Sequence, residues 1–412
     1  NKKRTFFSTL ERIRTEFLIS NYLLLMLSGR AKTCRNYQAL SRKETFGRAQ
    51  FHRRLQAPGA DPSTAFASSL QRFIASESDM GAKILVLSSP TSPELKVLQQ
   101  LPPGSEVVGV GRSLAELALS ESQLADVDIL AISGVGANAA KKADVQDVWP
   151  TLKGLKWIYS SSAGLENLLF PELIESPVLL TNAKGVYSNS LAEYALTACN
   201  WFAKDLPRLQ RAKADRNWDP YEVEELRGKT MGVVGYGDIG QACARLARAF
   251  KMHVVGLRRR AELSEKEKQE GLVDAMYTPD QLTELMSQSD YVVMSTPYTP
   301  QTEKLVNAAA IAAMKPNAVF INVGRGKCVD EEALIEALKS RRIRGAGLDV
   351  FATEPLPAES ELWGLDNVLM SPHCADRTKE FQIESLEFFV LNVRRWLAQE
   401  PLQNVVDKRA GY

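Results

Sequence analysis

Short apolar runs alternate with helix-like stretches along most of the chain after residue 82. Runs of this kind are typical of strands that are buried on both faces of a parallel sheet. The strands predicted from them are 84–87, 106–110, 127–132, 156–159, 231–234, 254–257, 291–295, 319–323, 347–350 and 368–371. The alternation therefore predicts an α/β fold made of two doubly wound parallel sheets.

Helical patterns separate these strands, and one of them divides the chain. Residues 191–206 contain no Gly or Pro before Pro207, which predicts a long helix connecting two domains. Further helices are predicted at 113–120, 241–250, 331–339 and 380–397. A chain of 412 residues is long enough for two domains of this type.

The first 80 residues differ from the rest in charge. They contain 14 Lys and Arg against 6 Asp and Glu, whereas the remainder contains 37 against 43. An Arg- and Ser-rich leader that is poor in acidic residues resembles an organelle transit sequence, and the apolar run 17–27 is shorter than the roughly 20 residues of a membrane span. We expect a mitochondrial or plastid location and no membrane anchor in the mature form. The alternative is a basic tail on a cytoplasmic protein.

The body gives no sign of nucleic-acid binding or of a metal centre. Its mildly acidic charge argues against a nucleic-acid partner. The five cysteines (Cys34, Cys199, Cys243, Cys328 and Cys374) lack paired or CxxC spacing, which predicts unpaired, buried thiols and neither disulfides nor zinc.

A glycine motif follows the predicted strand 231–234 directly. Gly235 permits a tight turn, Gly237 lets the backbone approach a pyrophosphate, and Gly240 allows close packing of a helix on the strand. The amides of Asp238 and Ile239, at the start of that helix, would point at the anion. The sequence therefore predicts a dinucleotide site.

The end of the next strand indicates which dinucleotide is bound. An NAD enzyme places a carboxylate there to bind the ribose 2′-hydroxyl, but this chain has Arg258, followed by Arg259 and Arg260. Guanidinium groups bind a 2′-phosphate well, so NADP is the predicted cofactor and NAD the alternative.

Three residues with suitable chemistry follow the ends of other predicted strands. His373 can donate a proton to a carbonyl oxygen, Glu354 can hold the imidazolium, and Arg325 can bind the carboxylate of a 2-oxo acid. Because the carboxyl ends of parallel strands meet at one edge of the sheet, we expect these catalytic residues to lie together. His253, at the start of a strand, is predicted to be a surface residue.

Three segments resemble the signatures of the D-2-hydroxyacid dehydrogenase family. They are 322–326 (Asn-Val-Gly-Arg-Gly), 348–357, which contains Asp349 and Glu354, and 371–373 (Ser-Pro-His), and the resemblance covers about residues 83–400. It implies a Rossmann dinucleotide domain over 188–375. It also implies a flavodoxin-like substrate domain over 81–187 and 376–412, with a cleft between the two domains and a dimer formed through the cofactor domain.

The resemblance also assigns further residues. Asp349 is expected near the nicotinamide carboxamide, with Val323, Thr296 and Pro297 beside the cofactor. The segment Ser160–Gly164 is similar to the family's substrate loop, whose amides at Ala163 and Gly164 would hold the substrate carboxylate together with Arg325. Asp376 departs from the pattern, because it stands where the family commonly has glycine.

These inferences favour hydride transfer from NADPH to glyoxylate, hydroxypyruvate or a similar small 2-oxo acid, which gives the D-2-hydroxy acid. Two alternatives stay open at this stage. One is an NAD-linked dehydrogenase of the phosphoglycerate or lactate type. The other is a dinucleotide-sensing protein similar to a co-repressor, in which the same residues can persist without turnover.

Overall fold

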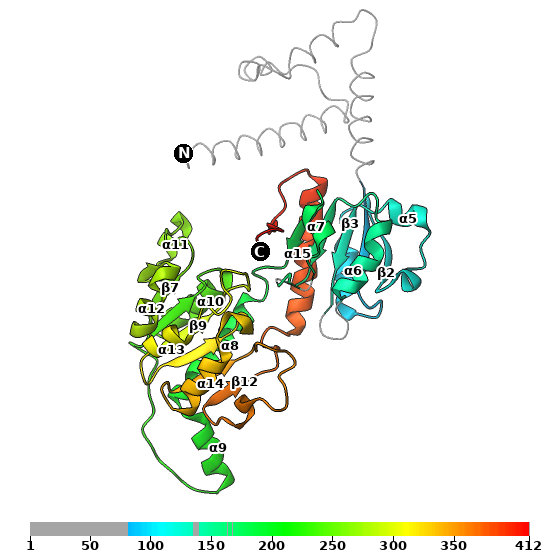
Figure 1. Cartoon of the computed structure of the whole chain (residues 1–412). Coiled ribbons are helices and arrows are strands. Elements are labelled where there is room, and N and C mark those ends of the chain that lie inside the picture. The colour runs from blue at the N-terminus through cyan, green and yellow to red at the C-terminus, as the bar shows by residue number, and fades with distance from the viewer. Residues whose placement is uncertain (1–80, 135–139, 163, 167, 412) are drawn as a thin grey trace, which may run out of the picture. The chain divides into compact units, whose positions relative to one another are not determined.

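The computed structural model describes residues 81–134, 140–162, 164–166 and 168–411 (Figure 1). All described residues belong to one compact unit, residues 78–412. The predicted leader, residues 1–80, therefore lies outside the described residues.

The first sheet contains five parallel strands in the order β2-β1-β3-β4-β5. Their bounds are β1 (Ala82–Leu87), β2 (Ser105–Gly111), β3 (Ile129–Ile132), β4 (Trp157–Ser160) and β5 (Leu179–Asn182). Every residue of β3 and β4 is buried, which explains why their sequences show no polar alternation. The strand order is that of a flavodoxin-like fold, as predicted.

The second sheet contains seven parallel strands in the order β12-β11-β10-β9-β6-β7-β8. Their bounds are β6 (Thr230–Val234), β7 (His253–Leu257), β8 (Ala275–Tyr277), β9 (Tyr291–Met294), β10 (Val319–Asn322), β11 (Gly345–Leu348) and β12 (Val368–Met370). The order reverses between β6 and β9, and ligands of doubly wound sheets bind outside the carboxyl ends of the strands at such a point. The predicted pair of parallel-sheet α/β domains is confirmed.

Helices cover both faces of the second sheet. Helices α8 (Ser188–Ala203) and α10 (Asp238–Ala249) pack in one apolar cluster with Met231 and Val233 of β6. The opposite cluster contains α12 (Leu282–Gln288), α13 (Ala308–Ala313) and α14 (Glu331–Lys339). The other helices before the last one, with η marking 3₁₀ helices, are η2 (Pro93–Gln100), α4 (Leu114–Leu117), α5 (Glu121–Ala125), α6 (Lys142–Val148), η4 (Trp149–Thr151), α7 (Pro171–Glu175), α9 (Leu206–Ala214), α11 (Glu265–Glu270), η5 (Pro279–Gln281), η6 (Gly326–Cys328) and η7 (Glu361–Gly364).

The last helix, α15 (Lys379–Leu397), returns to the first sheet. Its Phe389 ring lies 5.5 Å from the ring of Trp157 and 5.0 Å from that of Tyr159, both on β4. The hydroxyl of Tyr159 donates to the carbonyl of Ser385 at 2.5 Å. Packing of three large rings explains how a C-terminal segment is held against strands more than 200 residues earlier.

The structure corrects several predicted element boundaries. The helix predicted over 191–206 ends at Ala203, because Asp205 adopts a left-handed conformation (φ 45°) and caps α9 by accepting from the Arg208 amide. The region 113–120 contains one helical turn only, and the strand predicted at 347–350 runs from 345 to 348. Strands β5 and β8 were not predicted.

None of the helices in the described part of the chain has the length and apolar character that spanning a bilayer requires.

Candidate active site

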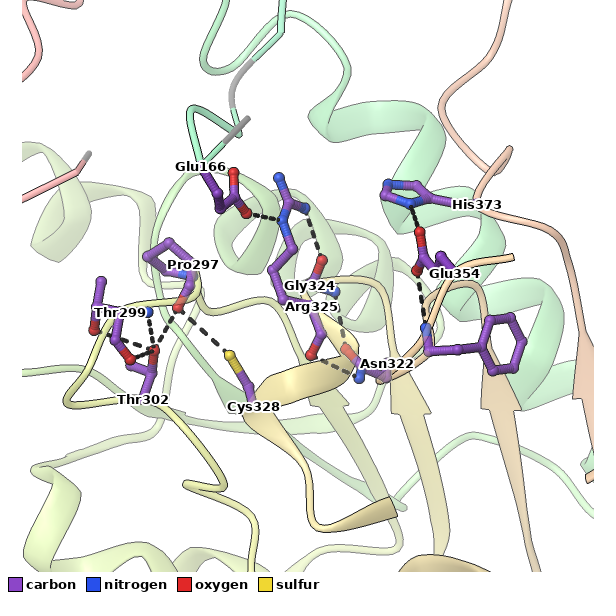
Figure 2. Close-up of polar contacts among 11 residues, drawn as sticks. Glu166, Pro297, Thr299, Thr302, Asn322, Gly324, Arg325, Cys328, Glu354 and His373 are labelled. Atoms are coloured by element: carbon purple, nitrogen blue, oxygen red, sulfur yellow. Dashed lines mark hydrogen bonds and ion pairs between the residues drawn. The ribbon is translucent and has the colours of Figure 1, made fainter. Parts of the chain in front are cut away.

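His373 and Glu354 form an ion pair at the edge of the second sheet. The Nδ1 atom of His373 lies 2.7 Å from Oε2 of Glu354, and Oε1 of Glu354 accepts from the Phe351 amide at 2.9 Å (Figure 2). The hydrogen bond to Glu354 raises the pKa of His373 above 6.5. Burial favours the neutral form of Glu354, but the bonds from His373 and Phe351 outweigh it and lower the pKa of this carboxyl group. Both shifts favour the ionised form of the pair, in which the imidazole carries the proton.

The loop that carries His373 is organised by Asp349. This carboxylate is 1% exposed, and its Oδ1 accepts from the Ser371 hydroxyl at 2.6 Å and from the amides of Cys374 and Ala375. The carbonyl of Asp349 accepts from the His373 amide at 2.8 Å. His373 itself has a φ of 50°, a conformation uncommon for a residue with a side chain. Asp349 thus fixes the backbone that aims the imidazole.

Arg325 lies beside this pair and is held by groups from both sheets. Its Nε donates to Oε1 of Glu166 at 2.5 Å, and its Nη1 donates to the carbonyl of Gly324 at 2.8 Å (Figure 2). A Cβ atom on Gly164 would overlap Nη2 of Arg325, so the predicted substrate loop and the predicted anchor do meet. Ala163, the other predicted loop residue, lies outside the described residues.

Glu166 is a site residue that the sequence analysis missed. Burial raises the pKa of Glu166, but the charge and hydrogen bond of Arg325 outweigh this and lower the pKa overall. The same carboxylate raises the pKa of Arg325 against the effect of burial. A carboxylate two residues after Gly164, in a loop expected to hold a substrate anion, was the available signal.

The glycine motif has the geometry that a dinucleotide site needs. Gly235 has a φ of 102°, and a Cβ on Gly240 would lie 2.5 Å from the Gly235 carbonyl. Gly237 is the N-cap of α10, and a Cβ there would meet no protein atom within 4 Å. Asp238 and Ile239 open the helix, and Asp238 Oδ2 lies 3.4 Å from Lys184 Nζ. The open side of Gly237 leaves the approach to the helix amides clear for a pyrophosphate.

The other residues predicted beside the cofactor lie after β9 and β10. Thr296 is 8% exposed, and its hydroxyl has no hydrogen-bond partner among the described residues. The Pro297 carbonyl accepts from Thr302 at 2.7 Å, and Val323 is 3% exposed. A buried hydroxyl without a partner at the switch point of the sheet fits a bound dinucleotide.

Arg258 directs every donor of its guanidinium at acceptors of the protein. It binds both carboxylate oxygens of Glu267, at 2.6 and 3.0 Å, and the carbonyls of Tyr236, Arg260 and Glu262. The hydrogen bond from Arg258 lowers the pKa of Glu267 to about 2. Arg258 therefore shapes the turn after β7, while Arg259 and Arg260 are exposed on that turn.

Other predicted residues are placed as follows. His253 is an exposed residue at the start of β7, as predicted. Cys199, Cys243 and Cys328 are buried free thiols, but the prediction for Cys374 is wrong, since this free thiol is exposed on the loop after His373. Cys34 lies outside the described residues. The described residues include no cluster of three or more His, Cys, Asp or Glu side chains that could hold a metal ion.

Comparison with known proteins agrees with this geometry. The D-isomer specific 2-hydroxyacid dehydrogenase NAD binding domain matches residues 197–375. The chain is 34% identical to the glyoxylate reductase of Pyrococcus furiosus over 64% of this chain and 79% of that protein. It is 32% identical to the D-3-phosphoglycerate dehydrogenase of Methanocaldococcus jannaschii over 79% of this chain. The match spans only 59% of the length of that relative.

Among solved structures, an NADPH-dependent glyoxylate/hydroxypyruvate reductase from Sinorhizobium meliloti in complex with NADP and sulfate matches with a TM-score of 0.66 and 28% identity. The match covers 80% of this chain and all of that one. The motifs, the two sheets and these relatives lead to one conclusion. The chain belongs to the D-isomer specific 2-hydroxyacid dehydrogenase family of NAD(P)-dependent oxidoreductases.

Proposed function

We propose that this protein reduces small 2-oxo acids, such as glyoxylate or hydroxypyruvate, to D-2-hydroxy acids with NADPH. The observation that carries the proposal is the hydrogen-bonded His373–Glu354 pair beside the Arg325 guanidinium. One group can donate a proton and the other can bind a carboxylate. Relatives named as glyoxylate reductases support this substrate class.

The residues of the chain perform three tasks in this proposal. Arg325 and the backbone near Gly164 bind the substrate carboxylate, so that the keto oxygen lies toward His373. A dinucleotide whose pyrophosphate binds at the Gly235–Gly240 motif would supply the hydride from its reduced nicotinamide. The Nε2 proton of His373 passes to the oxygen as negative charge develops there, while Glu354 holds Nδ1 and stabilises the imidazolium.

The preference for NADPH rests on the turn after β7. No carboxylate occupies the position after Leu257, where an NAD enzyme would bind the 2′-hydroxyl. Arg258 holds the turn in shape, and Arg259 and Arg260 supply the positive charge for a 2′-phosphate.

A substrate and cofactor panel tests the proposal. Purified protein is assayed with NADPH and NADH against glyoxylate, hydroxypyruvate, pyruvate and 3-phosphohydroxypyruvate. We expect glyoxylate or hydroxypyruvate with NADPH to give the highest kcat/KM, and His373→Asn to lower kcat by about 10²–10⁴ with NADPH affinity unchanged. Preference for NADH and the phosphorylated substrate would favour the phosphoglycerate-type alternative, which the Methanocaldococcus relative supports. NADPH binding without turnover of any 2-oxo acid would favour the dinucleotide-sensing alternative.

The arginine pair is tested separately. Replacement of Arg259 and Arg260 by Ala should raise KM for NADPH at least tenfold and leave KM for NADH unchanged, because only NADPH carries the 2′-phosphate. Lys266→Ala, an exposed cation on α11, is the matched control. Equal effects of the double variant on both cofactors would contradict the NADP proposal.

Two proposals concern the whole protein. A homodimer through the dinucleotide domain is supported by α9, which buries no residue, and by Trp218 after it, which is 94% exposed. Sedimentation of wild type and Trp218→Ser tests it.

An organelle address in residues 1–80 is tested by fusing them to a fluorescent protein, and a diffuse cytoplasmic signal would contradict it.

A further inference from the structure

Tyr187, near the proposed active site, has a buried hydroxyl group that makes no hydrogen bond to the described residues. The residue is the N-cap of α8, and its ring packs edge-on against Phe381 at 5.5 Å between ring centres. The side chain is 7% exposed, and its hydroxyl has no hydrogen-bond partner among the described residues. A buried tyrosine usually finds a partner for its hydroxyl, since leaving the group unbonded costs free energy.

Contacts of neighbouring residues place Tyr187 close to the active site. The Ser190 hydroxyl of α8 donates to the carbonyl of Ala375, on the loop of His373, and Nζ of Lys184 lies 3.4 Å from Oδ2 of Asp238 in the glycine motif. Burial raises the pKa of Tyr187, and the charges of Arg325, Asp376, Asp238 and Glu166 act on it in addition. The influence is reciprocal, because Tyr187 is among the groups that act on the guanidinium of Arg325. The hydroxyl therefore stays protonated at neutral pH and remains a hydrogen-bond donor near the proposed anion site.

A second buried tyrosine shows that an unpartnered hydroxyl alone does not indicate a ligand. Tyr291 is 2% exposed and its hydroxyl is likewise unpartnered among the described residues. It begins β9, at the opposite end of that strand from Thr296, and the groups that act on it are Cys199, Arg344 and others distinct from the site. Tyr187 differs in position, since its neighbours Lys184 and Ser190 bind residues of the glycine motif and of the His373 loop.

We propose that the Tyr187 hydroxyl donates a hydrogen bond to the carboxylate of the 2-oxo acid that Arg325 binds. This inference rests on the proposed function and adds a substrate-binding residue to it. In Arg325, Nε already donates a hydrogen bond to Glu166, and one hydrogen of Nη1 is donated to the carbonyl of Gly324. A neutral donor next to it strengthens the binding of a carboxylate without adding charge.

The test measures ligand binding and stability together in the full chain. Tyr187→Phe removes the hydroxyl and keeps the ring against Phe381. The Kd of oxamate, an unreactive 2-oxo acid analogue, is measured by calorimetry on the protein saturated with NADPH, and the melting temperature is measured without ligand. We expect the oxamate Kd and the KM for glyoxylate to rise about tenfold, with NADPH affinity unchanged. The melting temperature should be unchanged or higher, because an unsatisfied buried group is lost.

Tyr291→Phe is the matched control and should change neither oxamate nor NADPH binding. Oxamate binding to Tyr187→Phe within twofold of wild type would overturn the inference, and so would a lower melting temperature with equal losses for both ligands. If wild-type protein reduces glyoxylate while the variant gives either of these results, the proposed function is retained and only the role of Tyr187 is rejected. Wild type that neither binds oxamate nor reduces any 2-oxo acid removes both proposals.

Discussion

The proton on His373 depends on its neighbour. Because Glu354 raises the pKa of His373, the imidazolium persists above pH 6.5. Reduction consumes this proton, so kcat/KM for glyoxylate should be constant at low pH and fall about tenfold per pH unit above the raised pKa. Glu354→Gln keeps an acceptor and loses the charge, so the fall should begin at lower pH. Rate profiles of both proteins from pH 5 to 10 check this, and identical midpoints would exclude the role of Glu354.

A second residue-scale prediction concerns Glu166, which occupies Arg325 in the absence of substrate. Glu166→Gln retains an oxygen for Nε of Arg325 and removes a negative charge near the substrate carboxylate. The KM for glyoxylate should fall about threefold to tenfold, which corresponds to about 1 kcal/mol for a partly exposed charge. Glu166→Ala loses the hydrogen bond as well, and its kcat should fall. Steady-state kinetics separate the two variants, and equal effects would contradict this assignment.

The turn between β6 and α10 contributes both to the stability of the fold and to the proposed binding of NADPH. Gly240→Ala places a Cβ against the Gly235 carbonyl, and we expect a loss of about 1–3 kcal/mol in the free energy of unfolding. Gly237→Ala meets no protein atom, so stability should change little. Its methyl group would obstruct the pyrophosphate, and NADPH affinity should fall at least tenfold. Chemical denaturation and fluorescence titration measure the two effects, and tight NADPH binding by Gly237→Ala would refute the cofactor placement.

At the scale of the whole molecule, every residue assigned to the site lies in the compact unit 78–412. A chain that begins at Ser78 should therefore keep the NADPH affinity and the glyoxylate kcat/KM of the full protein within about twofold. Titration and kinetics on both chains check this expectation. Loss of activity on truncation, with NADPH binding intact, would show that residues 1–77 contribute to catalysis.

Much of this architecture follows from local sequence. Apolar runs predicted most strands of both sheets, because strands covered on both faces need no polar alternation. The glycine motif predicted the β6–α10 turn, since only glycine adopts the conformation of Gly235 and tolerates the packing at Gly240. Strands β5 and β8 escaped prediction because short apolar runs are ambiguous without their neighbours. His373, Glu354 and Arg325 were found because parallel strands bring their carboxyl ends to one edge.

Contacts between distant segments could only be learned from the tertiary structure. Glu166 and Arg325 are 159 residues apart, and the position of Glu166 near the predicted substrate loop did not show that its carboxylate binds Arg325. The donors of Arg258 are directed at Glu267 and nearby carbonyls rather than outward, and the burial of Tyr187 depends on Phe381 of a helix from the far end of the chain. Sequence alone determined the fold class, the cofactor motif and the reactive groups, because these depend on short-range patterns. Packing decided which charges those groups meet, because long-range neighbours leave no local pattern.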